Sequence, residues 1–474
     1  MQALRQLFRN HFGIEPAKVV PLKQDGSIRQ LYRMSADGVS IIGVEGNNPA
    51  ENAAFIGFTQ TFLGKGLPVP EIIAVSADGL CYLEEDLGNV LLHDWIREKR
   101  SGDDFTPEAR EMYGRVLREL TRFQIDARDA IDYGLCYQYP SFADETITGD
   151  LHYFRDKFLG TLVPGKMNPF KLEMDFTALK HHLVQEPCTY FLYRDFQSRN
   201  IMIRDGEPYF IDYQSGRRGA LQYDPASLLY EARAALPEDF REGLVEAYLV
   251  EASRRTRLDT EQWKTHFPAF ALVRVLQALG AFGNLGWWQG KADFLKGIGT
   301  GLENARSLTR RTGISLPELE RVLEDAAEDL EREVESTHRL TVHLFSFSYH
   351  FGTLPTDPAG NGGGFVFDCR CLPNPGRLPE FAELTGLDLP VQHFLQKSPK
   401  AGRFLEYVIR VCHQVVGTYL ENEYADLYIA LGCTGGQHRS VYCAERLKRF
   451  IGNRWPRSVA VNLRHASPLM EGRT

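Results

Sequence analysis

The chain has 474 residues, of which 43% are hydrophobic and 24% are charged, and its formal net charge is −8. A chain of this length has room for two or three domains with well-buried cores. No apolar run approaches the ~20 residues that cross a bilayer, and the first residues do not have the pattern of a signal peptide. We therefore expect a soluble, cytoplasmic protein with no membrane partner.

Charge divides the chain into two parts. The residues from His338 onward carry 15 Lys and Arg against 11 Asp and Glu, whereas the first 337 residues carry 39 against 51. This difference predicts separate domains. The small basic excess of the second part does not support nucleic-acid binding, which needs clustered basic patches.

Eight cysteines are scattered along the chain, which favours reduced thiols over a disulfide framework. Cys369 and Cys371 form a CxC pair, but no second Cys or His pair follows at zinc spacing. We interpret these two residues as alternate positions of a strand.

The N-terminal part of the chain has the pattern of a small antiparallel sheet. Short strands are predicted within residues 17–46, with turns at Asp25-Gly26 and Asp37-Gly38, and two more flank Asp78-Gly79. Residues 49–63 are predicted to form a helix. We expect a sheet-rich lobe over 1–88 with a hinge near Glu84–Gly88, followed by a mostly helical lobe over 89–315.

The run LPELERVLEDAAEDLEREVES, from Leu316 to Ser336, has apolar residues at helical spacing. We expect an amphipathic linker helix over 316–337 with a solvated acidic face. After it, LTVHLFSFSYHFG and GGFVFDCRCL predict strands, AGRFLEYVIRVCHQVVGTYL predicts a helix, and DLYIALGCTGGQHRSVYCAERLKRF predicts a strand, a glycine turn and a helix. Alternating strands and helices indicate a parallel or mixed α/β sheet in a domain over 338–474.

The stretch YFLYRDFQSRNIMIRDGEPYFIDYQ, from Tyr190 to Gln214, contains the residue types that phosphoryl transfer needs. Asp195 and Asn200 are five residues apart, and two short strands around an Asp-Gly turn would bring Asp212 back beside Asn200. The reaction requires a carboxylate to orient the attacking hydroxyl and oxygen ligands for Mg²⁺. We therefore expect Asp195, Asn200 and Asp212 to be catalytic, with Asn200 and Asp212 as the metal ligands.

This stretch resembles the catalytic loop of the aminoglycoside phosphotransferase superfamily, which runs His-Gly-Asp or His-Arg-Asp and ends in Asn; here Tyr193 replaces the His. Within that superfamily, the chain is most similar to the AmgK-type kinases over about residues 15–310. The similarity lies in five runs: QDGSIRQLYRM, GLPVPEII, LEEDLG, IDYQSGRRGALQYDPASLL and VLQALGAFGNLGWWQGKADFL. The resemblance implies an ATP- and Mg²⁺-dependent kinase that phosphorylates the anomeric hydroxyl of N-acetylmuramic acid or N-acetylglucosamine. It also implies an ATP site that includes Gly26, Ser27, Arg29, Glu84 and Asp86.

The stretch SADGVSIIGVEGNNPAEN lacks the third-strand lysine with which protein kinases hold the α- and β-phosphates. The AmgK-like kinases also do without it. Arg29 or Arg33 would then supply the positive charge. Because a fold does not fix an activity, a pseudokinase is the alternative, and the intact Asp195, Asn200 and Asp212 argue against it.

In ALGCTGGQHRSVYCAERL, from Ala430 to Leu447, a glycine turn separates an apolar strand from a helix. Backbone N–H groups at such a helix start, with hydroxyls and Arg439 nearby, predict an anion site. The run is not a Walker A loop, because no Gly-Lys-Ser/Thr follows. The alternatives are a turn needed only for chain reversal and a phosphatase nucleophile at Cys433, although a phosphatase loop places its Arg farther downstream.

The region from about Phe345 to Leu447 resembles the C-terminal domain of RapZ, the RNase adapter protein. Four runs carry the resemblance, in the same order as in that family: SFSYHFG, FDCRCLPNP, LTGLDLPV and GCTGGQHRSVYCAERL. In that family the domain senses glucosamine-6-phosphate and binds a small regulatory RNA. The resemblance implies a sugar-phosphate pocket lined by Asp368, Arg370, Asn374, Cys433, Thr434, Gly435, Gly436, His438 and Arg439. The chain departs from that family at two positions: His350 stands where the family has a Lys or a similar base, and the His-Arg-Asp that ends the family's domain is absent around Asn462–His465. In addition, a kinase replaces the family's N-terminal P-loop domain. For these reasons we carry over neither RNA binding nor an oligomeric state.

Together these features predict an α+β two-lobed protein-kinase-like (aminoglycoside phosphotransferase) domain followed by an α/β RapZ C-terminal-like domain. The predicted function is an amino-sugar kinase with an amino sugar as substrate, fused to a module that senses a sugar phosphate as effector. Two alternatives stay open: a regulatory RNA-binding or adapter protein with a pseudokinase, and an aminoglycoside kinase. Glu231, Glu238 and Asp239 would suit cationic aminoglycosides, although we interpret them as solvated helix residues.

Overall fold

The computed structural model describes residues 1–22, 29–102, 104–335, 339–351, 354–470 and 472. The chain divides into two compact units. Unit 1 comprises Met1–Phe154, Asn168–Leu279 and Thr300–Leu323, and unit 2 comprises Arg155–Met167, Gly280–Gly299 and Glu324–Thr474. The predicted Asp25-Gly26 turn and the predicted ATP-site residues Gly26 and Ser27 lie outside the described residues.

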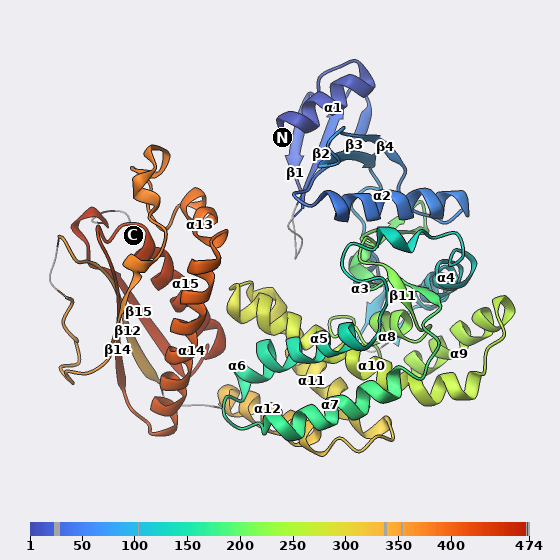
Figure 1. The fold of residues 1–474 in the computed structure, drawn as a ribbon. Helices are drawn as coiled ribbons and strands as arrows, with labels where there is room; N and C mark the ends of the chain where they lie inside the picture. The colour runs from blue at the N-terminus through green and yellow to red at the C-terminus, as the bar shows by residue number, and fades with distance from the viewer. Residues whose placement is uncertain (23–28, 103, 336–338, 352–353, 471, 473–474) are drawn as a thin grey trace. The chain divides into compact units, whose positions relative to one another are not determined.

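Unit 1 begins with a five-stranded antiparallel sheet in the order β1-β2-β3-β5-β4 (Figure 1). Its strands are β1 (Lys18–Pro21), β2 (Gln30–Ala36), β3 (Val39–Glu45), β4 (Ile72–Val75) and β5 (Cys81–Glu85). At the predicted turn between β2 and β3, Asp37 and Gly38 have φ values of 49° and 80°, as a two-residue hairpin requires. Helix α1 (Gln2–Phe12) buries Leu4 and Phe8 against Met34 of this sheet.

Helix α2 (Pro49–Gly64) connects the sheet to the helical lobe through aromatic contacts. The side chain of Asn48 caps it by accepting a hydrogen bond from the N–H of Ala50 (3.1 Å). Phe62 meets Phe123, Phe191 and Tyr213 with ring centroids 4.8, 5.3 and 5.1 Å apart. Because each such pair contributes ~0.5–1.5 kcal/mol beyond burial alone, α2 is held firmly against the stretch that contains Phe191 and Tyr213.

The helical lobe of unit 1 surrounds three small two-stranded sheets. Its helices are α3 (Leu92–Glu98), α4 (Pro107–Thr121), α5 (Asp144–Phe154), α7 (Pro169–Leu183), α8 (Tyr223–Leu229), α9 (Glu238–Arg255), α10 (Thr260–Phe282) and α11 (Ile298–Arg311). The sheets pair β6 (Arg100–Ser101) with β7 (Asp104–Phe105), β8 (Tyr190–Leu192) with β11 (Arg217–Gly219), and β9 (Ile201–Arg204) with β10 (Glu207–Phe210). Within the described part of the chain, one helical stretch, Thr260–Trp288, could cross a membrane by length and composition, and 67% of its most apolar window is buried in the protein.

Unit 2 contains a four-stranded, all-parallel sheet in the order β13-β14-β12-β15. Its strands are β12 (Leu340–Ser348), β13 (Phe365–Asp368), β14 (Asp426–Cys433) and β15 (Val459–His465), and its longer helices are α13 (Leu389–Gln396), α14 (Pro399–Glu421) and α15 (Arg439–Arg454). Helix α15 packs on β12, β14 and β15. The predicted α/β class is therefore confirmed, and β15 is an additional strand that the sequence pattern did not indicate.

The strand interpretation of Cys369 and Cys371 is wrong. These residues form a single 3₁₀ turn directly after β13, and Cys369 is buried whereas Cys371 is exposed. The turn forms because the carboxylate of Asp368 accepts a hydrogen bond from the N–H of Arg370 (2.8 Å), which caps the turn and ends the strand.

Helix α12 (Pro317–Glu335) forms as predicted, but its acidic side chains are not all solvated. Glu318 and Glu333 are buried. Glu318 accepts a hydrogen bond from the N–H of Asn168 (2.7 Å), and Glu333 accepts hydrogen bonds from the N–H groups of Arg457 (2.9 Å) and Ser458 (3.1 Å). The carboxylates thus satisfy loop N–H groups that would otherwise be buried without a partner.

Unit 2 is built from three separate stretches of sequence that share a polar core. The guanidinium of Arg454 is buried and donates to the carbonyls of Thr161 and Leu162, both at 3.1 Å, and to the carboxylate of Asp329 at 2.5 Å. Trp288 donates its indole N–H to Thr161 (3.0 Å) and packs against Phe450. Residues 338–474 alone therefore lack the partners of a buried cation.

His413 of α14 provides a pH-dependent contribution to stability. Its ring stacks on Trp455, and burial lowers its pKa from 6.5 to about 3. The unfolded chain therefore binds one more proton than the folded chain between those two pH values, so stability rises with pH across that range.

We expect the free energy of unfolding to fall by up to ~1.4 kcal/mol for each pH unit below 6.5 because of this residue. His413→Phe should reduce the slope of stability against pH, as measured by urea unfolding from pH 4.5 to 7.5. The exposed His393 supplies the control, because His393→Phe should leave the slope unchanged. Identical slopes for the parent and His413→Phe would contradict the assignment.

Candidate functional site

The loop that carries Asp195 is held by one buried carboxylate. Asp224, in α8, accepts hydrogen bonds from the backbone N–H groups of Tyr193 (2.8 Å) and Arg194 (3.1 Å) and from the side chain of Gln124 (3.1 Å). Burial raises the pKa of Asp224 to about 7, against the opposing effect of these donors. The carboxylate therefore fixes the backbone immediately before Asp195.

Arg194 is the second anchor of this loop. Its guanidinium forms a two-pronged ion pair with Asp150 of α5, at 2.7 and 2.8 Å, and donates to the hydroxyl of Tyr223 (2.7 Å). Its backbone lies in the left-handed region at φ 83°, a conformation that costs ~1–3 kcal/mol and persists only when its surroundings impose it. The surrounding contacts of Arg194 therefore hold the loop in one conformation despite the cost of this strained backbone.

The hairpin of β9 and β10 brings the three predicted catalytic residues together. The N–H of Ile211 donates to the carbonyl of Asn200 (3.0 Å), which places Asp212 next to Asn200. The side-chain amide of Asn200 donates to the carbonyl of Asp195 (3.0 Å). The pKa of Asp195 is raised, chiefly because surrounding protein excludes solvent, although Arg194 counteracts this effect.

Asp212 has the chemistry of a metal ligand. Its backbone is also left-handed, at φ 70°. Its carboxylate accepts hydrogen bonds from Gln214 and Arg29, both at 2.9 Å. Mg²⁺ prefers hard oxygen ligands and commonly uses one or two protein oxygens together with substrate phosphates, so the oxygens of Asp212 and Asn200 fit this ion.

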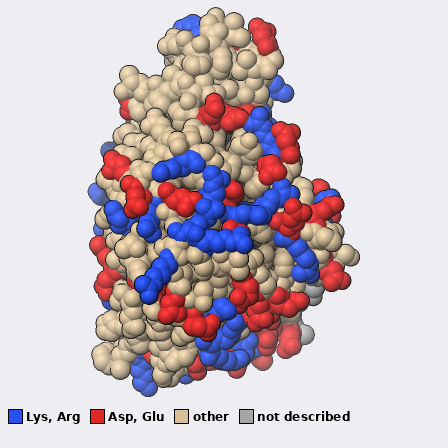
Figure 2. Space-filling model, turned by 90° about the vertical axis from the view of Figure 1, so that its right-hand side faces the viewer, with Lys and Arg blue, Asp and Glu red and all other residues tan. Residues whose placement is uncertain are grey.

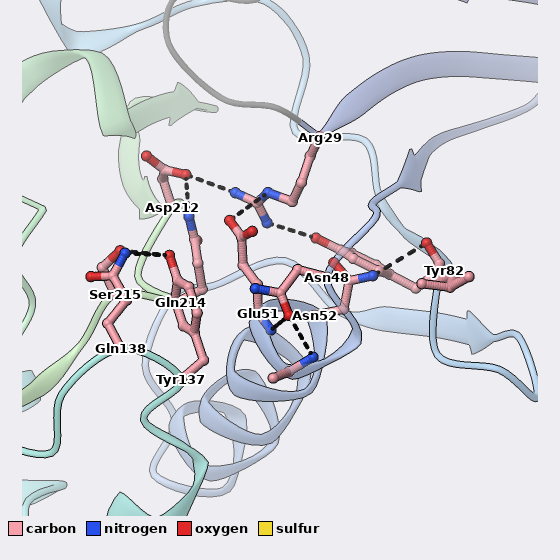
Figure 3. A network of polar contacts seen from close by, with 12 residues as sticks. Arg29, Asn48, Glu51, Asn52, Tyr82, Tyr137, Gln138, Asp212, Gln214 and Ser215 are labelled. Carbon is pink, nitrogen blue, oxygen red and sulfur yellow. Dashed lines mark hydrogen bonds and ion pairs between the residues drawn. The ribbon is translucent and has the colours of Figure 1, made fainter. Parts of the chain in front are cut away.

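Arg29 joins three elements at this point, as Figure 3 shows. Its guanidinium lies 2.9 Å from Asp212, 3.4 Å from Glu51 of α2 and 3.2 Å from the hydroxyl of Tyr82. Burial alone would lower the pKa of Arg29, but the pKa is raised because Tyr82, Asp212, Glu51 and Glu84 favour the charged form. The nearby Glu84 is buried, and burial raises its pKa to about 8.

The other predicted ATP-site carboxylate, Asp86, has a different environment. It receives a two-pronged ion pair from Arg33, at 2.7 and 2.9 Å, and a hydrogen bond from the hydroxyl of Ser40 (2.6 Å). Arg33 also donates to the carbonyl of Gly88 (2.8 Å). Arg33 thus stabilises the segment that connects the two lobes, whereas Arg29 reaches Asp212 directly after β10.

Unit 2 contains a cavity of about 350 Å³ with a basic lining. Its lining residues are Arg370, Cys371, Leu372, Pro373, Asn374, Arg377, Lys400, Thr434 and Arg439. Arg439 begins α15 and is buried, and its guanidinium donates to the carbonyls of Arg370 (3.0 Å) and Leu372 (3.1 Å) and to the hydroxyl of Thr434 (3.2 Å). Four cations around one cavity favour an anionic ligand.

Four of the predicted pocket residues line this cavity: Arg370, Asn374, Thr434 and Arg439. The other predicted residues are not part of its lining. Asp368 pairs with Arg370, His438 meets the carbonyl of Phe381 (2.9 Å), and the thiol of Cys433 lies 3.2 Å from the hydroxyl of Ser440. Gly436 has φ 66°, and a Cβ there would lie 2.6 Å from the Cβ of Ser467, so only glycine fits this turn.

Several residues that shape both sites are not among those that the sequence predicted. Asp224 is the one carboxylate in a helix whose residues are all buried, a pattern that could have indicated a buried hydrogen-bonding role. Arg377 and Lys400 line the cavity from segments far from the glycine turn. No local signal marks those two cations, because surface Arg and Lys are common.

Charged side chains on unit 1 are mixed in sign. Figure 2 shows a band of Lys and Arg across one face, with Asp and Glu among them. On α4 and α9, Arg115 pairs with Glu207 and Arg254 pairs with Glu251, both at 2.8 Å. Both signs of charge therefore lie on the face that Figure 2 shows, and Arg115 and Arg254 are each paired with a carboxylate. Glu231, considered above for a cationic substrate, accepts a hydrogen bond from the N–H of Ser198 (2.9 Å), and Glu238 pairs with Arg241 and Arg311.

Comparisons with known proteins match two stretches of the chain to two families. Residues 45–258 match the phosphotransferase enzyme family, and residues 340–467 match the RapZ C-terminal domain. Curated relatives include a nucleotide-binding protein of Albidiferax ferrireducens, 37% identical over 134 residues, and one of Azoarcus sp. strain BH72, 41% identical over 128 residues. These matches cover 28% and 27% of this chain and 42% and 40% of the relatives.

The chain is also similar to solved structures, two of which are named as kinases. One is the amicoumacin kinase hAmiN in complex with AMP-PNP, Ca²⁺ and Ami, 14% identical, with a TM-score of 0.45 over 65% of this chain and 93% of that one. Another is a Plasmodium vivax ethanolamine kinase, 14% identical, with a TM-score of 0.41 over 61% of this chain and 82% of that one.

The role of Asp224 can be tested through stability. Asp224→Ala removes the acceptor of two backbone N–H groups, and we expect the free energy of unfolding in urea to fall by at least ~2 kcal/mol. Asp239→Ala, an exposed carboxylate on α9, should change it by less than ~0.5 kcal/mol. A loss for Asp224→Ala no larger than that of the control would show that the loop does not depend on this carboxylate.

Proposed function

Because the chain joins a phosphotransferase-family domain to a RapZ C-terminal domain, we propose that it is an ATP-dependent kinase for an amino sugar, with a second site for a sugar phosphate. The substrate would be of the N-acetylglucosamine or N-acetylmuramic acid type, and the acceptor would be the anomeric hydroxyl. The observation that carries the proposal is the assembly of Asp195, Asn200 and Asp212 on one anchored loop and hairpin.

Asp195 would accept a hydrogen bond from the sugar hydroxyl, orient it toward the γ-phosphate and receive its proton. A raised pKa suits this task, because the carboxylate is then a better proton acceptor. Asp224 and Arg194 hold the loop so that this orientation is set before the substrate arrives. A magnesium ion on Asn200 and Asp212 would neutralise phosphate charge.

The charges around Asp195 favour a neutral or acidic sugar over a cationic aminoglycoside. Arg194, Arg274 and Arg217 favour the charged form of the Asp195 carboxyl, against the opposing effect of Asp212, and Arg217 and Arg274 are buried. Two of the three acidic residues considered for an aminoglycoside, Glu231 and Glu238, are instead bonded to the protein, and the third, Asp239, is exposed. This arrangement supports the amino-sugar assignment over the aminoglycoside alternative.

The kinase assignment is tested by Asp195→Asn. We expect turnover with Mg²⁺, ATP and N-acetylglucosamine or N-acetylmuramic acid to fall by ~100-fold or more, because a general base commonly contributes 10²- to 10⁴-fold. Asp205→Asn, at the exposed hairpin turn, is the matched control and should retain parental turnover. Phosphorus NMR of the product would locate the phosphate, and no turnover of either sugar by the parent would refute the assignment.

For the second domain, we propose that the basic cavity of unit 2 binds the phosphate of a phosphorylated amino sugar. Arg377 and Lys400 are exposed cations on its rim, and Arg439 forms part of its wall. Arg439 already donates to two carbonyls, so replacing it would also disturb the wall. Arg377 is the cleaner test of ligand binding.

We expect Arg377→Ala to weaken binding of glucosamine-6-phosphate or N-acetylglucosamine-1-phosphate by ~10-fold or more, since a hydrogen bond to a charged group is worth roughly 1.5–3 kcal/mol. Calorimetry on the full chain would measure this, with unphosphorylated N-acetylglucosamine as the ligand control. Arg403→Ala, an exposed cation on α14 outside the cavity, should have no effect. Equal affinities for phosphorylated and unphosphorylated sugar would sink the proposal.

A further inference from the structure

Strand β3 of this protein lacks the cation that protein kinases use to hold the nucleotide phosphates. Protein kinases hold the α- and β-phosphates with a lysine on the third strand, and a glutamate of the following helix positions that lysine. Strand β3 reads VSIIGVE and contains neither Lys nor Arg. Helix α2 nevertheless carries Glu51 in its first turn, so the carboxylate half of such a pair is present.

Arg29 supplies the missing half from the position directly before β2. Its Nε lies 3.4 Å from Glu51, and its Nη2 lies 2.9 Å from the metal-ligand candidate Asp212. Its side chain is buried among groups that favour the positive charge. One guanidinium therefore connects the first turn of α2 to the catalytic hairpin (Figure 3).

Arg33 was the competing candidate, and its contacts point elsewhere. Both prongs of its guanidinium are engaged by Asp86, and it also donates to Asn89 and the carbonyl of Gly88. All of these partners lie in the segment that connects the two lobes. The geometry thus distinguishes two arginines that the sequence could not.

We propose that Arg29 is the phosphate-binding cation of the nucleotide site and that it exchanges partners when nucleotide binds. Glu51 remains beside Nε of the guanidinium, while a phosphate oxygen replaces Asp212 at Nη2. Asp212 is then free to take up the metal ion. An arginine suits this exchange because its planar fork binds two oxygen groups at once, which a lysine ammonium does not do in a fixed geometry.

This inference rests on the proposed kinase function and adds to it a coupling between nucleotide binding and metal binding at Asp212. In the absence of nucleotide, Arg29 competes with the metal ion for Asp212. In the presence of nucleotide, Arg29 and the metal ion act on the same phosphates. Removing Arg29 should therefore weaken nucleotide binding and, separately, strengthen binding of a metal ion alone. A purely structural ion pair would not produce opposite changes.

The test measures two equilibria on the full chain. For Arg29→Ala we expect the affinity for ATP with Mg²⁺ to fall by ~10-fold or more, and the affinity for Mn²⁺ without nucleotide, followed by electron paramagnetic resonance, to rise. Arg29→Lys keeps the charge but loses the fork, so its ATP affinity should lie between those of the parent and Arg29→Ala. Circular dichroism establishes that each variant is folded.

Two further variants separate the possible outcomes. Arg9→Ala, an exposed cation on α1, controls for loss of charge from the lobe, and Arg33→Ala tests the competing arginine. Unchanged ATP affinity in Arg29→Ala, or an equal loss in Arg33→Ala, would overturn the inference. Asp195→Asn should bind ATP like the parent; if that variant lost turnover while Arg29→Ala bound ATP normally, the kinase assignment would stand and the role of Arg29 would fall.

Discussion

Buried guanidinium groups paired with carboxylates are the constraint on which this structure depends. Arg29, Arg194 and Arg454 each lie largely out of solvent, and each faces at least one carboxylate. Taking both charges out of water is costly, so such a pair is weak evidence of net stability. Removing one partner, however, leaves an uncompensated buried charge at a cost of ~3–5 kcal/mol. Each of these ion pairs therefore determines which two secondary-structure elements must pack together.

In unit 1 these pairs determine the geometry of the candidate active site. Arg194 ties the loop before Asp195 to α5, and Arg29 ties the hairpin residue Asp212 to α2. Asp224 completes the arrangement by binding the loop backbone. Two residues of this set, Arg194 and Asp212, have left-handed backbones. The charged network holds that strain in place, and the aromatic contacts of α2 supply the packing that keeps water out.

Buried arginines also determine how the segments of unit 2 pack together. Helix α15 begins with Arg439 in the wall of the basic cavity and ends with Arg454 bonded to the carbonyls of Thr161 and Leu162. Residues 155–167 come from the stretch that matches the phosphotransferase family, yet they belong to the same compact unit as the RapZ C-terminal domain. The boundary of the family match and the boundary of the compact unit therefore differ, because a buried cation needs acceptors that its own segment does not provide.

The sequence by itself determined the two fold classes, most strands and helices, and the hairpin of β9 and β10 with the candidate site residues beside it. Alternating apolar residues, Asp-Gly turns and the spacing of Asp195, Asn200 and Asp212 are local patterns, and local patterns are set by backbone geometry. Only the tertiary structure decided that Arg29 rather than Arg33 reaches Asp212, that Asp224 anchors the loop, and that Arg377 and Lys400 line the cavity of unit 2. These contacts join residues far apart in the chain, and their partners are chosen by burial and charge, which no short stretch of sequence records.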